Sequence, residues 1–241
     1  MTVSTASSTP SSTPTGPATP SPAPVASTSN RVLAHVATGA TALAAVCIAL
    51  AGSLDPGYSR VSEAISALAS QESAAAPVMI VGFLAMAVML LAAGATLFRA
   101  LPGKRAPVGA VLVVLAGLMT VVVGLARQSC SSLQADCLAR ESAGTVSASH
   151  WVHNLVSLPL FIFLTVAAFL WTAGLTRAAG STGLARFSLV VAIATAVFLV
   201  WFGSGAYGTF GGLVERVLVW LAFGWPVFLA VRLTRPTRAT A

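Results

Sequence analysis

The sequence contains very few charged residues. Asp, Glu, Lys and Arg together make up 8% of its 241 residues, whereas hydrophobic residues make up 56%. So few charges cannot cover the surface of a soluble globule, and the long apolar runs are too many to bury in one core. The composition therefore excludes a soluble globular protein and indicates an integral membrane protein.

Acidic residues are the scarcest charged group. Six Asp and Glu stand against 13 Lys and Arg, which gives a net charge of +7. Nucleic-acid binding would require these basic residues to cluster in a patch with aromatic or groove-fitting elements. They lie instead in short segments between apolar runs. We therefore expect no nucleic-acid partner and interpret the positive charge as a signal of membrane orientation.

The first 30 residues lack both charge and apolar runs. They are almost all Ser, Thr, Pro and Ala, so nothing offsets the entropy cost of ordering them. We expect residues 1–30 to form a disordered cytoplasmic tail. A signal peptide is not expected, because the basic start and the early apolar segment are both missing.

Six apolar runs follow Arg31, each long enough to span about 30 Å of hydrocarbon as a helix. They cover approximately residues 33–53, 75–98, 107–126, 151–175, 187–207 and 213–233. Membrane β-strands are excluded, because they alternate in polarity and are only about 10 residues long. We predict an all-α bundle of six transmembrane helices over residues 31–235, followed by a short basic cytoplasmic tail over residues 236–241.

The basic and acidic residues separate between the two sides of this predicted bundle. One side carries nine basic residues and no acid: Arg31, Arg99, Lys104, Arg105, Arg177, Arg186, Arg232, Arg235 and Arg238. The other side carries all six acids and four Arg: Asp55, Glu63, Glu72, Asp136, Glu141, Glu215, Arg60, Arg127, Arg140 and Arg216. Short cytoplasmic loops retain Lys and Arg, so we expect both termini to be cytoplasmic.

Cysteine is also scarce, with three in the chain. Cys130 and Cys137 lie in the same outer segment, where the compartment permits a disulfide between them. The alternative is two free thiols in a loose loop. Cys47 falls in the middle of the first helix, where we interpret it as a small apolar residue.

The first outer segment, Leu54 to Glu72, is polar and rich in turn residues. It opens with an Asp-Pro-Gly turn. Val61, Ile65 and Leu68 then recur at i, i+4 and i+7, which predicts a short amphipathic helix. It is too short to span the membrane, so we expect it to lie at the outer interface like a lid.

The fourth predicted helix begins with a polar stripe. His150, His153, Asn154 and Ser157 stand at i, i+3, i+4 and i+7, so they project from one face. A polar stripe is expected to face the bundle interior or a wet cavity rather than lipid. The alternative is that these are interfacial histidines, bonded to water and to neighbouring helices.

The sixth predicted helix carries Glu215 and Arg216 near its outer end. The helix dipole favours Glu215 there without any functional role. Arg216 would require a partner at membrane depth. We expect a salt bridge with Glu63, Asp55 or Glu215 that locks the bundle; an anion or lipid head group is the alternative partner.

These outer residues are the one constellation in the sequence that could carry chemistry. His35 lies at the opposite end, which argues against a di-haem protein. His-x-x-His alone is a weak metal signal, and we expect no metal or cofactor. The candidate catalytic residues are Glu63, His150, His153 and Glu215. The candidate ligand-binding residues are Asp55, Tyr58, His150, His153, Asn154, Ser157 and Arg216.

Three segments carry a resemblance to a known family. They are DPGYSRVSEAISAL in the first outer segment, SHWVHNLVSLPLF at the start of the fourth helix, and GGLVERVLVWLAFGWPVFLAVRL at the end. Together they resemble a bacterial membrane family catalogued as domain of unknown function 998. The resemblance covers about residues 31–235 and implies six helices in a bacterial plasma membrane. It brings no established activity, cofactor or partner.

Our leading hypothesis for the function is an accessory or transport-like protein that binds a lipid or small amphiphile in an outer-leaflet pocket. The first alternative is a membrane-embedded hydrolase, cyclase or isomerase that uses the His and carboxylate cluster. The second is a purely structural clasp that holds the lid to the fourth and sixth helices. Whether the protein is an enzyme, and which proteins it contacts, the sequence leaves open.

Overall fold

A computed structural model describes residues 27–101, 104–178 and 182–235. These ranges contain two short 3-10 helices, seven α-helices and no strand. Six of the α-helices are long and apolar enough to cross a membrane, so the predicted all-α, six-span architecture is confirmed. The elements are α1 (Thr28–Leu54), η1 (Ile65–Ala69), α2 (Ala76–Ala100), α3 (Ala106–Leu125), α4 (Ala135–Ser142), α5 (Ala148–Ala178), α6 (Thr182–Ser204), η2 (Gly208–Phe210) and α7 (Gly211–Thr234).

The first helix begins earlier than predicted. Residues 28–30, which we assigned to the tail, form the first turn of α1. The side chain of Ser27 accepts a hydrogen bond of 3.3 Å from the backbone N–H of Asn30, as an N-cap residue does. The rest of the predicted tail, residues 1–26, and the predicted tail at 236–241 lie outside the described residues.

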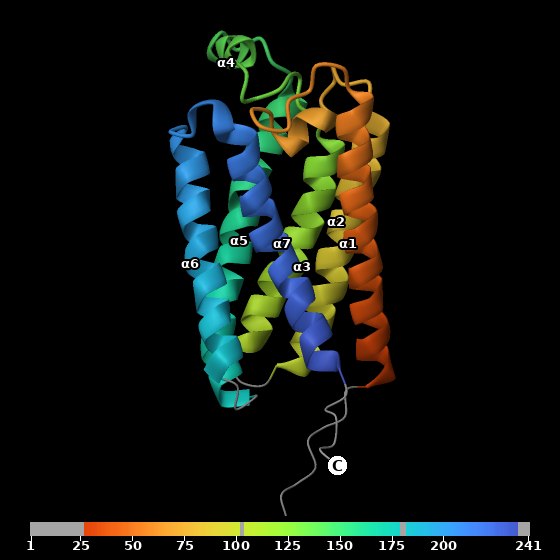
Figure 1. Cartoon of the computed structure of the whole chain (residues 1–241), viewed down its shortest axis with the longest axis vertical. Helices are drawn as coiled ribbons and strands as arrows, with labels where there is room; N and C mark the ends of the chain where they lie inside the picture. The colour runs from red at the N-terminus through yellow and green to blue at the C-terminus, as the bar shows by residue number, and fades with distance from the viewer. Residues whose placement is uncertain (1–26, 102–103, 179–181, 236–241) are drawn as a thin grey trace, which may run out of the picture.

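The six long helices stand side by side (Figure 1), and the contacts between them close into a ring. Each packs against the next along the chain, with α3 followed by α5, and α7 returns to pack on α1 and α2. The first and last described residues lie at one end, which we call the terminal end (Figure 1). The connecting segments that contain η1, α4 and η2 cover the opposite end, which we call the capped end.

Small residues allow the helices to approach closely. The face that α1 buries is a seam of small side chains: Ala34, Ala37, Ala40, Ala44, Cys47 and Ala51. A Cβ on Gly82 of α2 would lie 3.0 Å from the Cβ of Cys47, and one on Gly109 of α3 would lie 2.6 Å from Nε1 of Trp171 on α5. In lipid such contacts rely on shape, because burial of apolar surface gains little there.

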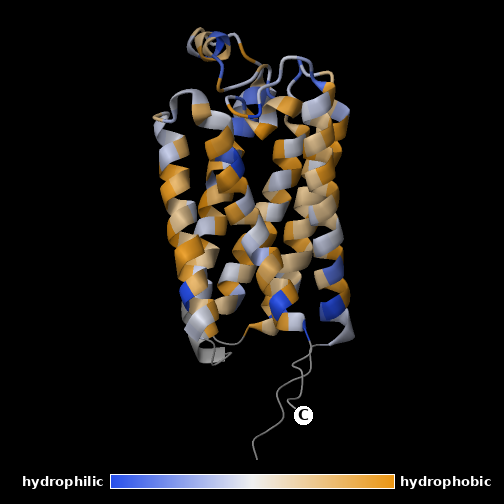
Figure 2. Cartoon of the chain, viewed as in Figure 1, coloured by the Kyte–Doolittle hydropathy of each residue, from blue (hydrophilic) through white to orange (hydrophobic). Residues whose placement is uncertain are grey.

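The outward surfaces of the long helices are apolar over most of their length, and polar residues gather at the two ends (Figure 2). Large apolar side chains are exposed on every long helix, for example Leu43, Val81, Leu118, Leu155, Val190 and Val217. A soluble protein of this size would not expose so continuous an apolar surface. The surface therefore matches a multi-pass membrane protein.

Candidate functional site

The segment between α1 and α2 folds into the capped end of the bundle. Gly57 has a φ of +90°, a conformation that favours glycine, and it turns the chain back toward the bundle. The predicted short helix is present as η1, a 3-10 helix of five residues, and all five are buried. It lies within the capped end, packed beneath the connecting segments and not exposed at their surface. Ile65 and Leu68 are buried, whereas Val61 is exposed, so the predicted stripe is not continuous.

Arg216 ties α7 to this segment. Its Nη1 donates to the backbone oxygens of Glu63 at 2.9 Å and Gly212 at 2.8 Å, and its Nη2 donates to the hydroxyl of Tyr58. The guanidinium also lies over the Tyr58 ring, 5.6 Å from the centroid. The predicted salt bridge was wrong, because Arg216 forms no ion pair with any described acid. Backbone carbonyls take the place of the carboxylate.

Tyr58 completes the contact with Arg216. Its hydroxyl donates to the backbone oxygen of Ala64 at 3.0 Å and accepts from the Arg216 guanidinium. Burial raises the pKa of Tyr58 to about 12, although the nearby positive charge of Arg216 acts in the opposite direction. The hydroxyl therefore stays protonated at neutral pH and serves as a neutral link between the two elements.

Glu215 lies in the second turn of α7 and is 7% exposed. Its carboxylate accepts a hydrogen bond from the backbone N–H of Ile65, the first residue of η1. An N–H at the start of a helix has no partner within that helix. Glu215 therefore caps η1, and it holds η1 against α7.

The polar stripe on α5 faces inward, and its first member is fully enclosed. His150 is 0% exposed. Its Nδ1 accepts a hydrogen bond of 3.1 Å from the backbone N–H of Ser129, and its Nε2 lies 2.7 Å from a carboxylate oxygen of Glu141. Because Nδ1 is an acceptor, Nε2 carries the ring proton and donates it to Glu141. Both ring nitrogens are occupied, so His150 positions the 129–141 segment.

His153 lies one turn further along α5. Its Nδ1 is 2.9 Å from the backbone oxygens of both Val123 and Ala126, at the end of α3. Two carbonyl partners require that Nδ1 carries a proton, so Nε2 of the neutral ring is a hydrogen-bond acceptor. His153 thus joins α5 to α3 through one nitrogen and leaves the other for chemistry.

Two further side chains of the stripe lie beside His153. Asn154 accepts a hydrogen bond of 2.7 Å from Nε2 of Gln128, and Ser157 donates to the backbone oxygen of His153 at 2.8 Å. Gln128 is 2% exposed, and its Oε1 is buried without a hydrogen-bond partner. A buried acceptor without a partner costs about 1 to 3 kcal/mol. Gln128 therefore favours a ligand or a water molecule that donates to it.

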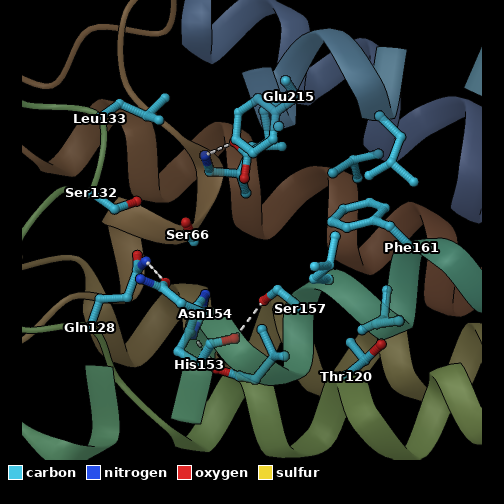
Figure 3. A pocket seen from close by; sticks show the side chains of 18 of the residues that line it. Ser66, Thr120, Gln128, Ser132, Leu133, His153, Asn154, Ser157, Phe161 and Glu215 are labelled. Carbon is cyan, nitrogen blue, oxygen red and sulfur yellow. Dashed lines mark hydrogen bonds between the residues drawn. The ribbon is translucent and has the colours of Figure 1, made fainter. Parts of the chain in front are cut away.

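A cavity of about 420 Å³ lies at the capped end between α5, α6, α7 and η1, and it reaches α2 and α3. Figure 3 shows Gln128, Asn154 and His153 on one side of it and Phe161 on the other. Further apolar side chains line it, namely Phe83, Met86, Val123, Leu160, Leu199, Phe202, Val219 and Phe223. The cavity therefore has a polar part and a larger apolar part.

The wall that α6 gives to this cavity is made of side chains that are not fully buried. The buried residues of α6 all lie between Ala185 and Thr195, in the half nearer the terminal end. Leu199 and Phe202, in the other half, line the cavity and are half-buried. On α5, Leu158 lines the cavity and is also 56% exposed. The cavity wall therefore reaches the outer apolar surface of the bundle.

The structure divides the predicted constellation between two places. His153, Asn154, Ser157 and Glu215 line the cavity. The other predicted residues lie apart from it: Asp55, Tyr58 and Glu63 line a separate pocket of about 250 Å³, and His150 and Arg216 line neither. In that second pocket Asp55 accepts a hydrogen bond of 2.5 Å from Ser73. The predicted residues thus belong to three groups: some line the cavity, some line the smaller polar pocket, and His150 and Arg216 hold the capped end together.

Gln128 and Glu141 also line the cavity, although neither was among the candidate site residues predicted from the sequence. They lie in the segment between α3 and α5, which also contains the unpredicted helix α4. Two signals for α4 were available, since Asp136 in its first turn and Arg140 in its last turn both suit the helix dipole. No periodic pattern marks Gln128, because it lies in an irregular stretch.

A disulfide joins Cys130 to Cys137, with a Cα–Cα distance of 5.7 Å, and is the pair expected from the sequence. These two residues and His150 form the one group of three potential metal ligands among the described residues. Sulfur atoms in a disulfide are not thiolate ligands, and both nitrogens of His150 are occupied. The group therefore stabilises the capped end and offers no metal site in this form.

The side chains around the cavity do not form a nucleophile and base pair. Ser157 bonds to the backbone of His153 and not to its ring, and no other Ser or Thr bonds to a His153 ring nitrogen among the described residues. The cavity can therefore bind, orient and accept hydrogen bonds. Proton transfer to Nε2 of His153 is the acid–base step that its geometry permits.

Comparison with known proteins assigns the chain to a family. Searches of curated proteins and of solved structures returned no match. A family model described as "Protein of unknown function (DUF998)" matches residues 17–232, which is most of the chain. The match covers all six membrane-spanning helices and both pockets of the capped end almost completely. The chain therefore belongs to the DUF998 family of membrane proteins of unknown function.

Proposed function

We propose that the protein binds a single-chain lipid or another small amphiphile in the cavity at the capped end, as an accessory or transport-like component of the membrane. The observation that carries this proposal is the division of the cavity into a polar and an apolar part. Its volume of about 420 Å³ falls within the range of about 300 to 1,000 Å³ typical of ligand pockets. An amphiphile can satisfy both parts at once.

The position of the cavity beside the lipid-facing surface supports the same proposal. Leu158 belongs both to the cavity wall and to the exposed surface of α5. In the adjoining half of α6, the cavity-lining side chains of Leu199 and Phe202 are only half-buried. An apolar chain can therefore reach the cavity from the hydrocarbon without crossing a polar barrier.

We also propose that the capped end faces away from the cytoplasm of a bacterial cell. The disulfide between Cys130 and Cys137 at this end supports that orientation, because disulfides persist in oxidising compartments. The terminal end carries the excess of basic residues, including Arg99 at the end of α2 and Arg232 at the end of α7. The ligand would then come from the outer leaflet.

The experiment is a binding measurement on protein in phosphatidylcholine nanodiscs, with dodecanol and dodecylamine as probes. Leu199→Trp fills the cavity from its α6 wall, and Leu189→Trp, on the same helix but on its exposed face, is the matched control. We expect saturable binding by the wild type and the control, and at least a roughly ten-fold weaker affinity in Leu199→Trp, because the indole occupies the ligand's volume.

Equal binding of a probe by all three proteins would contradict the proposal, because partition into lipid does not depend on the cavity. Thermal unfolding of each variant distinguishes lost binding from lost folding. A variant that loses stability but keeps its affinity would favour the purely structural clasp.

A further inference from the structure

The charges around the cavity are all of one sign. Two carboxylates line it, Glu141 from α4 and Glu215 from α7, and no Lys or Arg lines it among the described residues. Acidic side chains alone would not identify a ligand, since they can be solvated or paired within the protein. The partners of each carboxylate therefore decide what the cavity can bind.

Glu141 has no cationic partner despite its contact with His150. The Ser129 N–H donates to Nδ1 of His150, so this ring carries its proton on Nε2 and is neutral. The 2.7 Å contact is thus a hydrogen bond from a neutral donor to a carboxylate. The ion pair between Arg140 and Glu72 is the one described pair of an Arg or Lys with an acid, and it leaves Glu141 without a cation.

Glu215 also lacks a cationic partner, although Arg216 follows it in the sequence. All hydrogen bonds of the Arg216 guanidinium go to the backbone oxygens of Glu63 and Gly212 and to the Tyr58 hydroxyl. No described Lys, Arg or His forms an ion pair with Glu215. A buried carboxylate without a cationic partner is costly, and a cation bound in the cavity would lower that cost.

An independent observation points to a ligand that donates hydrogen bonds. Gln128 is 2% exposed and lines the cavity, and its Oε1 has no hydrogen-bond partner. Nε2 of His153 is a second acceptor in the cavity wall, because the protonated Nδ1 is held by two carbonyls. The polar part of the cavity therefore offers acceptors and negative charge together.

We propose that the amphiphile bound in this cavity carries a primary ammonium head group. The N–H donors of that group bind Glu215, Gln128 and His153, and its positive charge balances the two carboxylates. The apolar chain lies against Phe161, which Figure 3 shows in the cavity wall, and against Phe223, which also lines the cavity. This inference rests on the proposed function and adds the chemical class of the ligand.

The test compares three probes with the same chain, namely dodecylamine, dodecanol and dodecanoate, in phosphatidylcholine nanodiscs at neutral pH. We expect dodecylamine to bind about ten-fold tighter than dodecanol or more, because a charge-assisted hydrogen bond contributes more than a neutral one, and dodecanoate to bind weakest. The ratio of the dodecanol to the dodecylamine dissociation constant should fall to about one in Glu215→Gln.

Glu141→Gln tests the second carboxylate and should lower the same ratio by a smaller factor; it also covers the case in which Glu215→Gln fails to fold, because Glu141 does not cap η1. Glu72→Gln is the control, since Glu72 is outside the cavity, and its ratio should equal that of the wild type. A wild type that binds all three probes equally would overturn the ammonium head group and leave the proposed function intact. A wild type that binds none of them saturably would overturn both. A ratio unchanged in Glu215→Gln and Glu141→Gln would also overturn the inference.

Discussion

Single residues at the capped end both hold neighbouring elements together and line the cavity. His153 uses one ring nitrogen to bind α3 and has the other available to the cavity. Glu215 caps η1 and also lines the cavity. Because one side chain does both, the polar part of the cavity is fixed by the same bonds that hold α3, α5, α7 and η1 together. Preorganised groups of this kind reduce the entropy cost of binding.

At this scale we predict that Arg216→Leu destabilises the protein by about 2 to 3 kcal/mol. The substitution leaves the backbone oxygen of Glu63 and the hydroxyl of Tyr58 without their charged donor. Arg216→Lys should recover only part of this loss, because an ammonium cannot reproduce the planar fork. Thermal unfolding of the purified protein in detergent measures the effect.

The control for Arg216 is Arg60→Leu. Arg60 also donates to a backbone oxygen, that of Ala49, and to a hydroxyl, that of Ser53, but it is exposed. An exposed contact competes with water, so its loss should change the unfolding free energy by less than about 0.5 kcal/mol. Equal losses in the two variants would show that burial of the Arg216 contacts does not matter.

At the scale of elements, the start of α7 and the segment before η1 touch backbone to backbone. A Cβ on Gly212 would lie 2.8 Å from the backbone nitrogen of Glu63, and a backbone cannot rotate away as a side chain can. The N–H of Leu213 also donates to the backbone oxygen of Val61 at 3.1 Å. This contact requires glycine, and it sets the position of Glu215 one turn later.

We therefore predict that Gly212→Ala lowers both the unfolding temperature and the affinity for dodecylamine. Gly224→Ala on the same helix is the matched control, because its Cβ would meet nothing within 4 Å. Alanine is favoured over glycine in a helix by about 0.5 to 1 kcal/mol, so the control should be neutral or slightly more stable. A Gly212→Ala variant as stable as the control would contradict the close contact.

The sequence predicted the long helices and only part of the site, for physical reasons. Spanning hydrocarbon requires long apolar helices, and the polar stripe of His153 follows from helical periodicity alone. Gln128 and Glu141 lie in a segment whose path depends on the disulfide and on His150, which are tertiary contacts. Arg216 was assigned an acid partner because charge attracts charge, whereas the available partners were backbone carbonyls, which no sequence pattern reveals.

At the scale of the whole molecule, the bundle places the three connections that contain η1, α4 and η2 at one end. The capped end holds the disulfide and the cavity, and the terminal end holds both ends of the described chain (Figure 1). The cavity and the first and last described residues are thus on opposite sides of the bundle. The two sides can be distinguished by reporters that work in only one compartment.

We predict that alkaline phosphatase inserted after Gly144 is active and that the same enzyme fused after the last residue of the chain is inactive. Gly144 lies at the capped end in an exposed turn with a φ of +66°, where an insertion is tolerated. Green fluorescent protein at the same two positions should give the opposite pattern, because it fluoresces when it folds in the cytoplasm. The reverse result for both reporters would contradict the proposed orientation.

The bonds of Arg216 to main-chain oxygens also affect how the family can diverge. Every residue type supplies a carbonyl, so the side chain at position 63 can change by drift while Arg216 keeps its bond to that position. No acidic residue needs to change in step with Arg216. A statistical search for pairs that coevolve with Arg216 should therefore find Tyr58, which contributes its hydroxyl, and should not find Glu63.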